Sequence, residues 1–164
     1  MPFPDDLLEQ AQHLARREPK RPKQASLRRA VSTAYYALFH LLIGETVQNW
    51  KRPKERNTLA RMFDHGMMKR ACTAKRNELN AYFSTHPPST PALIVQQHIH
   101  LIAETFVEKQ QHRHTADYDS GTKWTRTDVN AKVNSVAAAF FSWKAIRNEP
   151  LAQNYLVTLL SRDR

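Results

Sequence analysis

The stretch Leu27-Arg28-Arg29-Ala30-Val31-Ser32-Thr33-Ala34-Tyr35-Tyr36-Ala37-Leu38-Phe39-His40-Leu41-Leu42 decides the fold of this chain. Its apolar residues recur every three to four positions, which is the spacing of one face of an α-helix. The spacing predicts a long helix from about Gln24 to Trp50 with one buried face. Seven side chains make up that face: Leu27, Val31, Ala34, Tyr35, Leu38, Leu41 and Leu42.

The opposite face of this predicted helix carries Ser32, Tyr36 and His40, each one turn after the last. A phenol and an imidazole stacked in this way suit two uses. The stripe either packs against a partner helix or a second protomer, or it lines a polar cleft. The sequence leaves both interpretations open.

Apolar spacing and helix-ending residues predict that the rest of the chain is also helical. Pro19 and Pro22 end a first short helix, and Pro87, Pro88 and Pro91 mark the clearest loop. Only three glycines argue against a β-rich or phosphate-loop architecture. The remaining predicted helices cover 5–17, 58–80, 92–118, a segment capped by Thr127 or Asp128 and ended by Pro150, and a short one over 151–160. The helix over 58–80 has Leu59, Met62, Phe63 and Leu79 as apolar anchors and Gly66 as a weak point.

Length and composition predict one domain. The 164 residues are 41% hydrophobic, which is enough for a core in a chain of this size. No window of about 18 apolar residues predicts a membrane span, and the first residues lack the order of a secretory signal, so we expect a cytoplasmic protein without membrane contact. Cys72 stands alone, which excludes an intrachain disulfide and predicts a small buried hydrophobe.

Positive charge is concentrated in the first half of the chain. Residues 1–76 hold 16 of the 25 Lys and Arg but only seven of the 15 Asp and Glu. Two basic runs, 16–23 and 51–56, fall in predicted loops. Such runs are either solvated loops that aid solubility, or a patch that attracts a polyanion and releases its counterions.

The segment from Arg113 to Asp119 places a cation, carboxylates and a phenol at the end of an apolar helix. Helical spacing from the apolar stripe that ends at Phe106 puts Arg113 near the core, with Asp117 one turn further on. Because a guanidinium stays charged, Arg113 needs a carboxylate or phosphate partner. One interpretation is a helix-end ion pair covered by Tyr118; the other is a binding site.

Three short motifs make the chain resemble the HEPN domain family over roughly residues 5–145. They are Ala34-Tyr35-Tyr36-Ala37-x-Phe39-His40, then His65-Gly66-x-Met68-Lys69, and then Arg113 followed by Ala116-Asp117-Tyr118-Asp119. The resemblance implies an antiparallel up-and-down bundle of about four to five main helices within one domain, with its core over about 5–147. It also implies a homodimer, and a role as a ribonuclease or toxin, or beside a nucleotidyltransferase-type antitoxin.

The chain departs from the ribonuclease members of that family at one position. Those members carry a histidine four to six residues after the arginine, whereas no histidine follows Arg113 at that spacing. His114 would point roughly 100° away on a helix. His40 could replace the missing group only if folding brings it close, so Arg113 and His40 are catalytic candidates only for a ribonuclease.

The sequence therefore predicts an RNA- or nucleotide-phosphate-binding or regulatory protein, and the resemblance implies that it belongs to a toxin–antitoxin or defence-type system. The alternatives are a divergent metal-independent endoribonuclease and a purely structural dimerisation module. No cofactor or metal site is predicted, since His98 with His100, and His112 with His114, lie two residues apart on helices. The predicted binding residues are Arg113, Asp117, Tyr118, Tyr36, Ser32 and His114.

Overall fold

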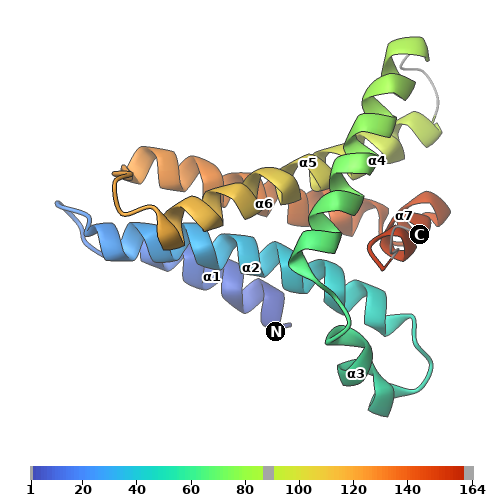
Figure 1. Ribbon diagram of the computed structural model, residues 1–164, viewed down its shortest axis with the longest axis horizontal. Coiled ribbons are helices and arrows are strands. Elements are labelled where there is room, and N and C mark those ends of the chain that lie inside the picture. The colour runs from blue at the N-terminus through green and yellow to red at the C-terminus, as the bar shows by residue number, and fades with distance from the viewer. Residues whose placement is uncertain (1, 87–90, 161–164) are drawn as a thin grey trace. The chain divides into compact units, whose positions relative to one another are not determined.

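A computed structural model describes residues 2–86 and 91–160 of the chain. All regular elements in these ranges are helices, with no strand among them, which confirms the all-α prediction. The HEPN-type antiparallel bundle and the single domain over 1–164 stay predictions. The elements are α1 (Phe3–Ala15), α2 (Gln24–Gln48), the 3-10 turn η1 (Pro53–Glu55), α3 (Arg56–Ala60), α4 (His65–Thr85), α5 (Pro91–Tyr118), α6 (Arg126–Ile146) and α7 (Pro150–Thr158) (Figure 1).

Helix α2 forms where the apolar spacing predicts it, ending two residues before Trp50. Its predicted apolar face is buried at every position from Leu27 to Leu42. Two further alanines, at 30 and 37, are buried beside this face, and their small side chains allow close approach of neighbouring helices. The period of the sequence therefore sufficed to place the core side of this helix.

The prediction of a single helix over 58–80 is wrong. Helix α3 ends at Ala60, and α4 begins at His65 after a break. Asp64 causes the new start, because its Oδ1 accepts a hydrogen bond of 2.9 Å from the backbone N–H of Met67, as an N-cap does. Met62, a predicted apolar anchor, lies in the break and is 57% exposed. Gly66, predicted as a weak point inside a helix, lies in the first turn of α4 instead.

Other helix boundaries differ by a few residues. The cap of α6 is Thr125, whose Oγ1 accepts a 3.2 Å hydrogen bond from Asp128 N–H, rather than Thr127 or Asp128. Pro150 opens α7 as its first residue, where a missing N–H does no harm. Of the predicted proline loop, Pro91 begins α5, and Pro87 and Pro88 lie outside the described residues.

The chain divides into two compact units. Unit 1 comprises Met1–Leu41 and Glu108–Phe140, and unit 2 comprises Leu42–Val107 and Phe141–Arg164. Within unit 1, α1 runs alongside the first part of α2, and the end of α5 runs alongside the beginning of α6 (Figure 1). All predicted site residues, from Ser32 to Tyr118, belong to unit 1.

Arg126, the first residue of α6, joins two parts of unit 1. Its guanidinium donates to the carbonyl oxygens of Ala15 at 3.2 Å and Pro19 at 3.1 Å, and also to that of Glu18. These carbonyls lie at and just beyond the end of α1, where helical hydrogen-bond partners run out. A cation there satisfies the carbonyls and opposes the negative end of the helix dipole.

Unit 2 is held by buried and half-buried contacts. The Sγ of Cys72 lies 3.1 Å from the Tyr155 hydroxyl, with both side chains buried. Burial raises the pKa of the Cys72 thiol to about 12, so the predicted inert, buried cysteine is confirmed. Arg147 and Glu45 form an ion pair at 2.5 Å.

Within residues 2–86 and 91–160, no helix combines the length and apolar content needed to cross a bilayer.

Candidate functional site

The polar stripe of α2 lies against the end of α5 within unit 1. Ser32 is buried, and its hydroxyl donates to Asp117 Oδ2 at 3.3 Å. Tyr36 and His40 are half-buried. Of the two interpretations that the sequence left open, packing against a helix of the same chain is present. A protomer interface at this stripe stays a prediction.

Arg113 and Asp117 form the ion pair that helical spacing predicts. Arg113 Nη1 lies 3.6 Å from Asp117 Oδ2, and the two side chains are 14% and 29% exposed. The distance is long for a charge-assisted hydrogen bond, which is typically about 2.7–2.9 Å. Asp117 therefore neutralises Arg113 only in part, while its second contact with Ser32 fixes its position.

Two aromatic rings support the guanidinium of Arg113. Its Cζ lies 5.3 Å from the centroid of Tyr35 and 5.7 Å from that of Tyr36, both within the range of cation–π attraction. Arg113 Nε is buried and has no hydrogen-bond acceptor among the described residues. The rings position the cation while leaving it capable of further hydrogen bonding.

His40 sits one turn beyond Tyr36 in an aromatic surrounding. Its ring centroid lies 5.0 Å from Phe3, 5.3 Å from Phe39 and 6.5 Å from Tyr36. Burial lowers the pKa of His40, because the charged imidazolium loses water. A neutral imidazole near pH 7 can accept a proton, as the general base of a ribonuclease must.

His114 and Tyr118 form a separate aromatic pair on the outer side of α5. Their ring centroids lie 5.0 Å apart, and Tyr118 is 71% exposed. Tyr118 therefore does not cover the Arg113–Asp117 pair, contrary to the lid interpretation. The structure gathers Ser32, Tyr36, Arg113 and Asp117 by direct contacts, whereas His40 joins them only through Tyr36, and His114 and Tyr118 stand apart.

An open hollow of about 400 Å³ lies beside this cluster, at the end of α5. Both Asp117 and Tyr118 line it, so it connects the ion pair with the exposed aromatic pair. Sequence reasoning missed most of its other residues. The full lining is Gln24, Arg28, Ala116, Asp117, Tyr118, Ser120, Thr122 and Lys123.

Arg28 forms hydrogen bonds with the backbone that surrounds this hollow. Its guanidinium donates to the carbonyl oxygens of Ala116 at 2.9 Å and Asp119 at 2.7 Å, and to that of Thr122. The arrangement resembles that of Arg126, with an arginine at the start of one helix capping the end of another. A signal for Arg28 was present in the sequence, since it lies one turn before Ser32 on the stripe that continues to Tyr36 and His40.

His112 is a second residue that the sequence analysis did not single out for this environment. Burial and the nearby charges of Lys109 and Lys132 lower the pKa of His112 to about 4. Lys109 is itself buried, with its amino group 3.7 Å from Glu108. His112 is thus neutral at pH 7, and its Nδ1 has no hydrogen-bond partner among the described residues.

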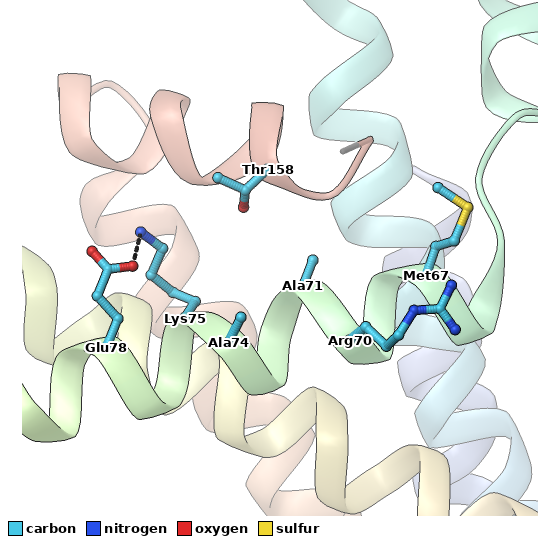
Figure 2. Close-up of a pocket in the computed structure, with 7 residues that line it drawn as sticks. All are labelled: Met67, Arg70, Ala71, Ala74, Lys75, Glu78 and Thr158. Carbon is cyan, nitrogen blue, oxygen red and sulfur yellow. Dashed lines mark ion pairs between the residues drawn. The ribbon is translucent and has the colours of Figure 1, made fainter. Parts of the chain in front are cut away.

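Unit 2 contains a hollow of about 280 Å³ between α4 and the end of α7, and it has a mixed lining (Figure 2). Ala71 and Ala74 form its floor, Thr158 faces them, and the Lys75 amino group pairs with Glu78 at 3.0 Å. Arg70 also lines this hollow, so its charged side chains are two cations and one carboxylate. In the part of the chain that the structure describes, no three His, Cys, Asp or Glu side chains lie close enough together to bind a metal ion.

The chain was compared with protein-family models, curated proteins and solved structures. None of them matches it. The resemblance to HEPN domains therefore rests on the three sequence motifs, and the functional argument rests on the geometry of unit 1.

Proposed function

We propose that this chain is a HEPN-like protein that binds RNA or nucleotide phosphates, with Arg113 contacting the phosphate. The single observation that carries the proposal is the state of the Arg113 guanidinium. It is a permanent cation seated on Tyr35 and Tyr36, and a carboxylate 3.6 Å away neutralises it only in part. A phosphate oxygen can complete the hydrogen bonding that Asp117 leaves unmet.

The charge of unit 1 supports this proposal. The segment after α1 exposes five cations, Arg16, Arg17, Lys20, Arg21 and Lys23, in the same unit as Arg113. Its one carboxylate, Glu18, is engaged by the Ser26 hydroxyl at 2.7 Å and by the Lys23 backbone N–H at 3.2 Å. These contacts lower the pKa of Glu18 but leave the excess of positive charge exposed. Such a surface attracts a polyanion.

The test is equilibrium binding of a labelled single-stranded RNA in EDTA over a series of salt concentrations. The wild type is expected to bind more weakly as salt rises, with a log–log slope that loses about 0.7 for each phosphate contact removed. Arg113→Met should weaken binding and lower that slope, whereas the exposed Arg61→Met in unit 2 serves as a charge-matched control. Absence of salt-sensitive binding by the folded wild type would overturn the proposal.

A divergent metal-independent endoribonuclease is a second candidate, favoured by one observation. His40 is a half-buried imidazole with a lowered pKa, placed next to Tyr36, which touches the Arg113 guanidinium. Cleavage of RNA in EDTA that is lost in both Arg113→Ala and His40→Ala would support it. Binding without cleavage, with binding retained in His40→Ala, would instead leave the binding function alone.

We also propose that the protein acts in the cytoplasm and that it assembles with a second copy or with a partner protein. A homodimer, and pairing with a nucleotidyltransferase-type antitoxin, follow from the family resemblance alone. A purely structural module is the remaining rival, since the contacts of Arg113 also brace α5 against α2. The RNA-binding experiment separates these two, because a structural arginine would change stability without changing the salt dependence.

A further inference from the structure

We infer that the hollow at the end of α5 is a stacking site for an unpaired nucleobase, with Tyr118 as its platform. This inference rests on the proposed function and specifies the ligand as single-stranded nucleic acid. Its starting observation is that Tyr118 is 71% exposed although it lines a hollow of about 400 Å³. An aromatic ring beside an open hollow offers one face to a base, and stacking of this kind tolerates any base.

The ring of Tyr118 is positioned before a ligand arrives. Its centroid lies 5.0 Å from that of His114, one turn earlier on α5, with a 52° angle between the planes. This tilted contact limits the rotation of both side chains on the helix surface. A base that stacks on Tyr118 therefore meets a ring that has already lost part of its conformational freedom, which favours binding.

The turn after α5, which supplies Ser120, Thr122 and Lys123 to the lining of the hollow, is also fixed. Arg28 clamps the backbone around Asp119, and the Asp119 carboxylate accepts hydrogen bonds of 2.9 Å from Gly121 N–H and from the Thr122 hydroxyl. At the base of the loop, Gln24 exchanges two hydrogen bonds with the backbone of Trp124, at 2.7 and 2.8 Å. Hydrogen bonds at several points thus hold the turn after α5 in place.

The charges around the hollow favour a base on its inner side and a phosphate on its outer side. Asp117 is held by Arg113 and Ser32, so its carboxylate presents an acceptor that suits the amino group of a base. The Arg28 guanidinium is directed to backbone carbonyls. Lys123 is exposed at the rim and supplies a cation for a phosphate there. A paired base could not reach Tyr118 without leaving its duplex.

The experiment uses single-stranded RNA that carries one 2-aminopurine, together with a duplex of the same length. Binding is followed by anisotropy and stacking by quenching of the 2-aminopurine. Tyr118→Ala should weaken binding of the single strand by about 5- to 150-fold and remove the quenching, and Tyr118→Phe should restore both. Affinity for the duplex should be unchanged. Phe141→Ala is the matched control, since Phe141 is an equally exposed aromatic in unit 2, at 74%.

The outcomes separate the inference from the proposed function. If Tyr118→Ala binds the single strand within twofold of the wild type, with quenching intact and binding still sensitive to salt and to Arg113, the stacking site is refuted and the phosphate site stands. If the wild type binds neither RNA, both are refuted. Equal losses of affinity for the single strand in Tyr118→Ala and Phe141→Ala would also refute the stacking site, because the effect would then be general to exposed aromatic side chains.

Discussion

Replacing Arg113 by methionine tests how strongly unit 1 depends on this half-buried cation. The change keeps most of the apolar length of the side chain but removes its charge. It deletes the 3.6 Å pair with Asp117 and the contacts with the rings of Tyr35 and Tyr36. We expect the free energy of unfolding to fall, and the contacts allow its size to be worked out.

The ion pair contributes the smaller share. An exposed i,i+4 pair stabilises a helix by about 0.3–0.5 kcal/mol, and this pair is more buried but has the less favourable order, with the cation first. We assign it about 1 kcal/mol. Cation–π contact contributes about 0.5–1 kcal/mol when exposed and about 2 when desolvated, and Arg113 is 14% exposed. Arg113→Met should therefore destabilise the protein by about 2–3 kcal/mol.

Urea unfolding followed by circular dichroism measures this loss, and a double-mutant cycle divides it. Arg113→Met, Asp117→Asn and the double variant should give a coupling energy of about 1 kcal/mol. Arg29→Met, an exposed arginine on α2, is the control and should change stability by less than about 0.5 kcal/mol. A loss in Arg113→Met no larger than in this control, or a coupling near zero, would refute the reasoning.

Three further predictions address other contacts. Arg28→Met should lower the free energy of unfolding by about 2–3 kcal/mol in urea, since three carbonyls lose a charged donor, and an effect below about 1 kcal/mol would contradict the clamp. Asp64→Ala should cost about 1 kcal/mol by removing the cap of α4, while Asp64→Asn should restore most of it. The pKa of His112 is about 4 when folded and about 6.5 when unfolded, so its contribution is present above pH 6.5 and is lost as pH falls toward 4. His112→Gln should therefore flatten the acid side of the stability–pH curve by about 1–2 kcal/mol, a range reduced for its half-exposed ring, and an unchanged curve would contradict this.

Local order was predictable from the sequence because it depends on neighbours along one helix. The buried face of α2 and the pairing of Arg113 with Asp117 both follow from the 3.6-residue period. The break before α4 has a local signal that the apolar spacing over 58–80 does not contain, because Asp64 can cap a new helix through its side chain. Cys72 was placed correctly in the core on the basis of its side chain alone.

Contacts between segments distant in sequence were decided only by the tertiary structure. Helical spacing puts Ser32, Tyr36 and His40 on one stripe, but it cannot say which helix packs against it, since that depends on the packing of the whole of unit 1. Folding brought Asp117 to Ser32 across 85 residues, and Arg28 to the turn after α5 across about 90. It also placed a hollow beside the exposed Tyr118, because that hollow is formed by residues of α2 and of the turn after α5 that are distant from each other in sequence.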